Sequence, residues 1–536
     1  MSDPVHASDP LGIPVPILGS NRSSQSSQSV KDTTATPPTD TISKSLADDE
    51  HLQELSQDGV RERVSVVSVT SEGSFQRGGI TERGVLEKQD FEKEWENDVV
   101  TWDGPDDPAC PMNWCSGKKL KCLILYGSST MCATFTSSIF SSSAGFIARD
   151  YHISEEVALL GLSLFILGFS LGPIFFGPVS EVYGRKLAIV PPLFIFICFS
   201  AATATAQDLQ TIFITRFFAG VFGSAPVTIV GGGLADIYNQ RQRGSAIVVY
   251  SLCIVGGPTV APIIGIAVSQ ALSWRWTAYI PVILTSIITS LDFFFLPETS
   301  HASILTEKAR RIRLKSKRWG LHSAHEEKDL SLKNFFHKML IIPLKMWVKE
   351  PMVTLITLYG GFAYGILYML FAAVPIIYGQ QRGWKPVPTT LPILGVLIGT
   401  LVAAAINWIY SEKYFARYLD THGGKAPPER RLPPMMIGAV AFPIGFFLTG
   451  WTSQSSVHWF PSVLGLGFVG MSFLLILQSG MNYLIDAYTS HAASAVAAYT
   501  FSRSILGAAM PLIASPLLNN LGTQWACTLL GCLAIL

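Results

Sequence analysis

The stretch Gly177-Pro-Val-Ser-Glu181-Val-Tyr-Gly184-Arg185-Lys186 joins two long apolar runs and carries the densest cluster of charge for some distance on either side. Its glycines allow two helix ends to approach closely. Glu181 and Arg185 are four residues apart, so they can pair if the turn is helical. The sequence therefore predicts a tight, charged connection between two helices. The same sequence is also compatible with an ordinary loop whose basic residues only set the membrane topology.

Composition places the whole chain in a membrane. Of 536 residues, 49% are hydrophobic and only 14% are charged, against about 25% charged in soluble proteins. The formal net charge of +1 gives no reason to expect nucleic-acid binding. The eight cysteines include no C-x-x-C pair, so neither a zinc site nor a disulfide framework is indicated. We expect a polytopic membrane protein without a metal or other cofactor.

Twelve apolar runs are close to the roughly 20 residues that cross a bilayer as a helix. Backbone in lipid must satisfy its own hydrogen bonds, so these runs are predicted to be helices. A polar segment divides them into two sets of six, which gives an all-α membrane protein of two pseudo-symmetric six-helix bundles. The runs are 120–143, 157–179, 187–206, 210–234, 245–270, 277–296, 352–378, 388–409, 434–452, 459–483, 492–517 and 523–536.

Four regions follow from this pattern. Residues 1–117 are rich in Ser, Thr, Pro and acids and are predicted to be a disordered cytoplasmic tail. The first bundle is 118–296, the linker 297–350 and the second bundle 351–536. The last run would span about 21 Å against a hydrocarbon core of about 30 Å. Either the sequence is truncated, or this short helix ends inside the bilayer.

Basic residues set the expected orientation. With the N-terminus inside the cell, the cytoplasmic connections carry Arg185, Lys186 and the strongly basic linker. The outer connections carry only Arg149, Arg275, Arg382 and Lys385. We expect a multi-pass protein of the cell membrane with a cytoplasmic N-terminus.

Several residues inside the spans invite a functional interpretation. Arg216 is a charge about a turn and a half into the fourth span, where it faces a cavity or a partner unless it snorkels to the surface. Asp236, at the end of that span, could equally be a solvated acid. The first span is rich in Ser and Thr, which predicts that part of it faces water; local bonds to helix carbonyls are the alternative.

The fifth span carries small residues and two prolines. They bend the helix and let a neighbour approach, which a merely structural, kinked packing helix would also explain. These residues are Gly257, Pro258, Ala261, Pro262 and Gly265.

Aromatic residues in the seventh and eleventh spans form a candidate substrate cavity. Tyr364 and Tyr368 share a helix face, whereas Tyr359 lies about 140° away from Tyr364. Tyr499 and the second intramembrane charge, Arg503, come from the eleventh span. Such a stripe is more often packing, but in a cavity it could stack planar organic molecules.

The opening stretch resembles the loop between spans two and three of the major facilitator superfamily, Gly-x-x-x-Asp-x-x-Gly-Arg-(Arg/Lys), with Glu181 replacing the Asp. Within this superfamily, the chain is similar to the fungal twelve-span drug:proton antiporter branch, which includes polyamine, multidrug and secondary-metabolite exporters. Segments that carry this likeness are Trp274-Arg275-Trp276, Pro297-Glu-Thr299 and Asn482-Tyr-Leu-Ile-Asp486-Ala-Tyr488.

The resemblance implies roles for individual residues. Arg216 matches the arginine implicated in proton coupling, and Asp236 would pair with Arg185 to latch the cytoplasmic side in the outward-facing state. The fifth span is similar to the family's antiporter motif, with Cys253 in place of its first Gly and Ala261-Pro262 in place of its last pair. That motif favours export.

We therefore expect a proton-coupled efflux transporter that exports a drug, toxin or secondary metabolite across the plasma membrane by alternating access. Its partners would be a small-molecule substrate, protons and the lipid bilayer, and the protein would be a monomer. A polyamine or organic-acid transporter and a non-transporting membrane sensor are the alternatives. Scarce acids in the spans, Asp292 among them, argue mildly against a strongly cationic cargo. No phosphate loop supports ATP-driven export, and no catalytic set indicates an enzyme.

Overall fold

The computed structural model describes residues 98–327, 341–422, 426–488 and 492–535. Most of the predicted tail, residues 1–97, lies outside the described residues. Residues 98–117 were expected to belong to that disordered tail, but the structure packs 98–110 against the linker, buries Trp114 in the first bundle and begins α3 at Ser116. Val100 is buried, and its N–H donates to the His322 carbonyl at 2.8 Å. Asp103 forms an ion pair of 2.5 Å with Lys308.

The first set of apolar runs forms long helices where the sequence predicts them. Ser154 and Asp208 cap two of these helices, each by accepting a hydrogen bond from the backbone N–H three residues on. The helices are α3 (Ser116–Ile139), the short η3 (Phe140–Ser143) and α4 (Ala144–Asp150), α5 (Glu155–Tyr183), α6 (Arg185–Thr205), α7 (Leu209–Ile237), α8 (Gln240–Ala271) and α9 (Trp276–Phe295).

The second set follows α10 (His301–Ser316) and α12 (Ile342–Lys349) of the linker. Two of its helices contain π-helical turns, η5 and η6. The elements are α13 (Pro351–Val374), η5 (Pro375–Gln381), α14 (Pro386–Thr390), α15 (Ile393–Ile409), η6 (Tyr410–Phe415), α16 (Ala416–Thr421), α17 (Pro433–Trp451), α18 (Trp459–Ala487) and α19 (Ala492–Ile535).

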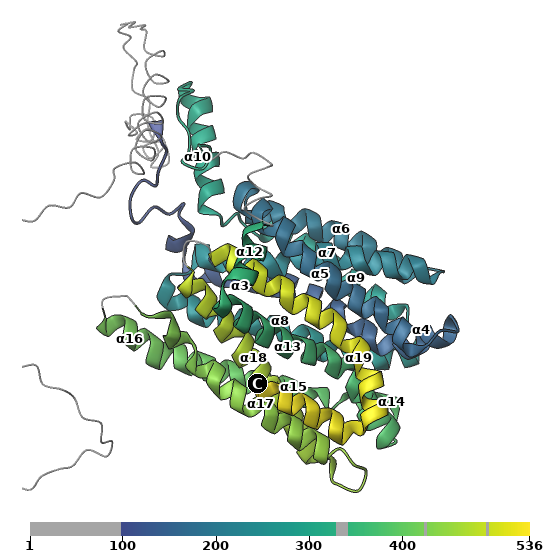
Figure 1. The fold of residues 1–536 in the computed structure, drawn as a ribbon. Coiled ribbons are helices and arrows are strands. Elements are labelled where there is room, and N and C mark those ends of the chain that lie inside the picture. Colours follow the sequence, from purple (N-terminus) through teal and green to yellow (C-terminus); the bar gives the residue numbers. More distant parts are fainter. Residues whose placement is uncertain (1–97, 328–340, 423–425, 489–491, 536) are drawn as a thin grey trace, which may run out of the picture. The chain divides into compact units, whose positions relative to one another are not determined.

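The described chain is helical and contains one isolated β-bridge, Val99 to His322. Ten of its helices are long and apolar enough to cross a membrane. The hydroxyl-rich α3, 24 residues long, coincides with the first predicted span but is less apolar than those ten helices. Gly522, with φ 76° and ψ 155°, breaks α19, and the part beyond it turns back beside α17 (Figure 1). The arrangement is consistent with the twelve predicted spans.

Glycines let α5 and α7 pack backbone to backbone. A Cβ added at Gly220 would lie 2.0 Å from the Phe165 carbonyl oxygen, and one at Gly168 would lie 2.2 Å from that of Phe217. Helices in lipid gain stability from such close packing because burial from water contributes little there. This contact holds α7, and with it Arg216, tightly against α5.

Gly220→Ala is expected to lower the thermal unfolding midpoint in detergent, because the new methyl group must push the two backbones apart at a cost of about 1–3 kcal/mol. The matched control is Gly256→Ala on α8, where an added Cβ meets no atom within 4 Å. That variant should be as stable as the wild type or slightly more so. Equal midpoints for the two variants would contradict this account of the α5–α7 contact.

Candidate functional site

The predicted connection between the second and third spans is shorter than the sequence suggests. Helix α5 continues through Gly177 and Glu181 to Tyr183, and α6 begins at Arg185. The turn therefore rests on Gly184 alone, whose φ of 94° is strained for other residues. A Cβ at Gly184 would also lie 2.5 Å from Glu298 Oε2.

Arg185 forms the main polar contact of this junction. Its Nε donates to Asp236 Oδ2 at 2.9 Å, and its Nη1 donates to Ser180 Oγ at 2.7 Å. Glu181 is exposed, because Gly184 ends the helix before the four-residue spacing can bring Arg185 beside it. Asp236 at the end of α7, and not Glu181 in the last turn of α5, neutralises the arginine.

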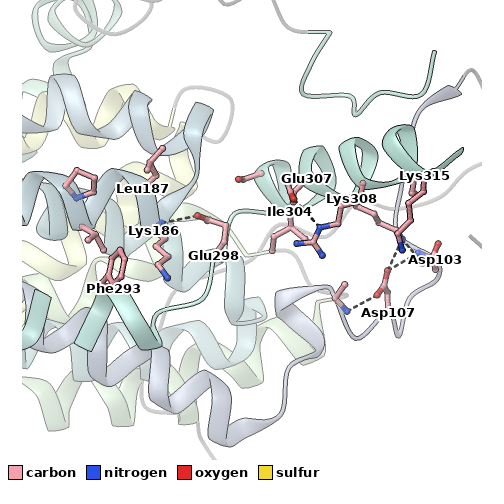
Figure 2. Close-up of a pocket in the computed structure, with 16 residues that line it drawn as sticks. Asp103, Asp107, Lys186, Leu187, Phe293, Glu298, Ile304, Glu307, Lys308 and Lys315 are labelled. Carbon is pink, nitrogen blue, oxygen red and sulfur yellow. Dashed lines mark hydrogen bonds and ion pairs between the residues drawn. The ribbon is translucent and has the colours of Figure 1, made fainter. Parts of the chain in front are cut away.

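Glu298 closes the junction from the segment after α9. Its Oε1 accepts from the backbone N–H groups of Arg185, Thr299 and Ser300, and its Oε2 accepts from Lys186 N–H at 3.0 Å. Arg185 and Lys186 open α6, so a carboxylate here also meets the positive end of that helix. Figure 2 shows the Glu298–Lys186 bond at one end of a pocket of about 780 Å³ that reaches α10.

The second half repeats the arginine–aspartate pair. Arg431 Nε donates to Asp486 Oδ2 at 2.8 Å, and its guanidinium lies 3.5 Å from the centre of the Phe415 ring. From the sequence, Asp486 could have been a cytoplasmic polar residue without a special role. In the structure it lies at the end of α18, as Asp236 lies at the end of α7.

Arg216 is buried in the first bundle, with 4% of its surface exposed, which excludes snorkelling in this conformation. Its guanidinium donates to the carbonyl oxygens of Gly161, Thr136 and Ser137 at 3.1–3.2 Å. The rings of Phe140 and Phe165 lie 4.5 and 4.4 Å from its Cζ. Carbonyls and ring faces, not a carboxylate, hold this charge among its described contacts.

A hydrogen-bonded bridge joins the two halves beside Arg216. Ser137 Oγ lies 2.9 Å from Tyr368 Oη, and Tyr364 Oη donates to Tyr368 Oη at 3.5 Å. The Arg503 guanidinium lies 5.1 Å from the centre of the Tyr364 ring. One arginine from each half is thus connected through α3 and α13. We call this set, Arg216, Ser137, Tyr368, Tyr364 and Arg503, the central bridge.

The other two predicted cavity tyrosines donate hydrogen bonds to different helices. Tyr499 is fully buried behind Arg503 and donates to the Leu477 carbonyl at 3.2 Å. Tyr359 instead donates to the Ala534 carbonyl near the end of α19 at 3.3 Å. Tyr364 and Tyr368 are also buried, so the aromatic residues are packed together in this conformation.

The fifth-span motif packs α8 against α3. Pro262 has no N–H to bond the Pro258 carbonyl, and Ser138 Oγ donates to that carbonyl at 2.9 Å. Ser142 Oγ donates to the Pro262 carbonyl at 2.8 Å. Ala261 is buried, and a Cβ at Gly257 or Gly265 would lie within 3.0 Å of α3 atoms. Many α3 hydroxyls, expected to face water, are therefore buried in contacts between helices.

The halves also touch at both ends. At the end that carries Gly184, Ser245 Oγ donates to Glu412 Oε1 at 2.6 Å. At the opposite end, Ser515 Oγ donates to Glu156 Oε1 at 3.0 Å. The two halves are therefore in contact in the middle and at both ends.

Sequence reasoning missed the role of Glu298. The segment Pro297-Glu-Thr299 carried only family resemblance, since one acid after a span gives no sign of its target. Its nearness to Gly184 depends on how α9 packs beside α6.

Glu298→Gln is expected to destabilise the protein in detergent by about 1.5–3 kcal/mol, because an amide nitrogen facing Lys186 N–H replaces a charged acceptor. Thermal unfolding would measure the change. Glu307→Gln is the matched control, since Glu307 pairs with Arg311 at the exposed surface of α10, where about 0–1 kcal/mol is typical. Equal effects of the two changes would count against a special role for Glu298.

Comparisons with known proteins agree with this geometry. A family profile described as "Major Facilitator Superfamily" matches residues 127–536. The "Major facilitator superfamily multidrug transporter FLU1" of Candida albicans is 42% identical over 442 residues, 82% of this chain and 72% of that protein. The "Efflux pump bik6" of Gibberella fujikuroi is 42% identical over 456 residues, 84% of this chain and 93% of that protein.

A solved structure shows the same fold at low identity. The proton:xylose symporter XylE bound to 6-bromo-6-deoxy-D-glucose has a TM-score of 0.55 and 14% identity, covering 79% of this chain and 94% of that chain. The family predicted from the loop motif is confirmed. The chain belongs to the major facilitator superfamily, as a multi-pass membrane transporter related to fungal multidrug and efflux transporters.

Proposed function

We propose that this protein is a proton-coupled exporter of small organic compounds that works by alternating access. The observation that carries the proposal is the central bridge, which joins the buried Arg216 of one half to the partly buried Arg503 of the other through two tyrosines and a serine. A substrate that enters between the halves must part this bridge. The names of the relatives, a multidrug transporter and an efflux pump, support the outward direction.

The chemistry of the bridge suggests the cargo class. Arg503 Nε is buried without a hydrogen-bond partner among the described residues, and two tyrosine rings lie beside the guanidinium. An unpaired donor on a cation, flanked by aromatic faces, suits a planar molecule that carries an oxygen or a negative charge. We infer a neutral or anionic aromatic cargo in preference to a polyamine.

Arg216 is the proposed proton-coupling residue of this cycle. Its guanidinium connects carbonyls of α3 and α5 while it is anchored on α7, so a shift of α3 disturbs a buried charge. The proposed cytoplasmic gate consists of Gly177, Glu181, Gly184, Arg185, Lys186 and Asp236. We place the protein in the plasma membrane as a monomer with a cytoplasmic N-terminus.

Transport by the purified full chain in lipid vesicles tests the proposal. The probes would be 1-pyrenesulfonate as a planar anion, rhodamine 6G as a planar cation and spermidine as a polyamine. We expect uptake into inside-out vesicles to require an acidic interior and to stop when a protonophore collapses the gradient. Movement of pyrenesulfonate that ignores the gradient would overturn proton coupling. Strong transport of spermidine alone would overturn the cargo class, and transport of none of the probes would favour the sensor alternative.

Arg216→Lys should reduce gradient-driven transport by about tenfold or more, equivalent to about 1.4 kcal/mol. A lysine keeps the charge but cannot donate in a planar fork to three carbonyls. Initial rates at equal protein density measure the effect. Arg310→Lys, on the exposed face of α10, is the control and should transport normally. Normal transport by Arg216→Lys would show that charge alone suffices there.

Asp236→Asn should make the Gly184 end open more often, because Arg185 loses its ionic partner. Cysteines introduced as Ser245→Cys and Glu412→Cys, in a background without the native cysteines, can be joined by a short bis-maleimide. We expect a lower cross-linking yield in Asp236→Asn. Asp208→Asn, which changes an exposed helix cap, is the control. Unchanged yield and unchanged transport would remove Asp236 from the gate.

A further inference from the structure

The carboxyl group of Asp292 is buried and belongs to none of the contacts described above. It lies near the end of α9 with 0% of its surface exposed. Its Oδ2 lies 2.5 Å from Ser129 Oγ on α3, and its Oδ1 has no hydrogen-bond partner in the described structure. A buried carboxylate with one hydrogen bond recovers little of the hydration it lost. The neutral acid suits this environment far better.

The number of hydrogen atoms available between Ser129, Asp292 and Leu125 also indicates that Asp292 is protonated. Ser129 Oγ lies 2.5 Å from Asp292 and also 2.8 Å from the Leu125 carbonyl oxygen. The serine has one hydroxyl hydrogen, and the carbonyl can only accept. If Ser129 donates to Leu125, the hydrogen between Ser129 and Asp292 must come from Asp292. Both short contacts are hydrogen bonds at once only when Asp292 is protonated.

The groups that face Asp292 leave its charge largely unopposed. Two lysines lie at the end of α9: Lys186 of α6, with Nζ 5.9 Å from the centre of the Phe293 ring, and Lys121 of α3, with Nζ 4.6 Å from that of Phe295. Neither forms an ion pair with Asp292 among the described contacts. From α3, Cys132 is a further titratable neighbour. Tyr250 and Cys253 of α8 bond or pack elsewhere, with Tyr250 donating to the Val227 carbonyl. The segment η3, Phe140–Ser143, contains no titratable residue.

Helix α9 turns a polar face inward. Its buried residues are Thr277, Pro281, Thr285, Thr289 and Asp292, whereas Phe293, Phe294 and Phe295 are exposed. Thr285 and Thr289 lie on the same face as Asp292. Thr285 faces Cys132 of α3, and the Thr289 hydroxyl group has no hydrogen-bond partner among the described residues. Hydroxyl groups in a row can pass a hydrogen bond along the helix towards the carboxyl group. Packing alone would favour apolar side chains on this face.

We propose that Asp292 binds the proton that drives export. The proposal rests on the proton-coupled function above. In the conformation described here a proton occupies Oδ2, and the neutral acid donates to Ser129. On release the carboxylic acid gives this proton to water on the side that has opened, and the carboxylate that remains accepts a hydrogen bond from Ser129 and attracts Lys186.

This site lies beside the gate. Lys186 follows Gly184 and Arg185, and its side chain lies near Phe293, the residue after Asp292, with Nζ 5.9 Å from the ring centre (Figure 2). Glu298, six residues beyond Asp292, holds the backbone of the same lysine. A charge that forms at Asp292 therefore pulls on the start of α6, next to the Arg185–Asp236 pair.

Infrared spectroscopy of the reconstituted protein tests protonation without any substrate. The wild type should show the C=O stretch of a buried carboxylic acid, which disappears in Asp292→Asn and on deprotonation. Asp208→Asn is the matched control and should keep the band. The same band in Asp292→Asn would overturn the assignment.

Transport separates the role of Asp292 from the proposed function itself. Asp292→Asn keeps the shape and a bond to Ser129, so 1-pyrenesulfonate exchange down its own gradient should stay within about twofold of the wild type, while proton-driven accumulation falls by about tenfold or more. Asp292→Glu should recover part of it. If Asp292→Asn still accumulates the probe with the proton gradient, Asp292 is not the carrier. If the wild type moves the probe without the gradient, proton coupling fails, and the infrared result alone decides whether Asp292 binds a proton.

Discussion

The structure depends on keeping a guanidinium charge inside a bundle that lies in lipid. Arg216 is 4% exposed, and oxygen atoms of the protein accept its hydrogen bonds. The carbonyls of Thr136 and Ser137 are available because α3 ends at Ile139 and continues as a 3-10 turn. The α5 carbonyl of Gly161 and two phenylalanine rings complete the set. The end of α3, the close contact of α5 with α7 and the buried charge therefore require one another.

A second constraint acts at the Gly184 end, where α5 reverses into α6 through a single residue. The first N–H groups of α6 need acceptors, and Glu298 supplies a charged one from outside the helix pair. Arg185, the first residue of α6, then reaches Asp236 on α7. One turn thus ties α5, α6, α7 and the end of α9 together. Because the second half contains the corresponding Arg431–Asp486 pair, each half closes its own end by the same kind of interaction.

Apolar run length and the loop motif were enough to predict the helices and the family. Arg216 could be singled out because a charge inside a span is rare. The partners of Arg216 could not be predicted, because they are backbone carbonyl groups, which every residue has. Helical spacing places Tyr364 and Tyr368 on one face. Tyr359 was grouped with them because all three tyrosines could stack a planar cargo, and the sequence does not show that Tyr359 bonds elsewhere. Glu298 bonds Arg185, which lies 113 residues away in the sequence, and Ser129 bonds Asp292, which lies 163 residues away. No local sequence pattern predicts such contacts. The order of residues 98–110 likewise depends on the distant linker.

Helix α3 is the element on which the proposed events converge. Its Ser129 meets Asp292, its Ser137 meets Tyr368 of the other half, and its Ser138 bonds the carbonyl that Pro262 leaves free. A hydroxyl group can donate or accept, so each contact can change partner without leaving a charge exposed to lipid. An apolar α3 would pack as well but could not respond to a proton. The abundance of Ser and Thr on this span is thus better explained by exchangeable contacts between helices than by a water-facing surface. A small rotation of α3 would act on the proton site, the buried arginine and the bridge between the halves at once.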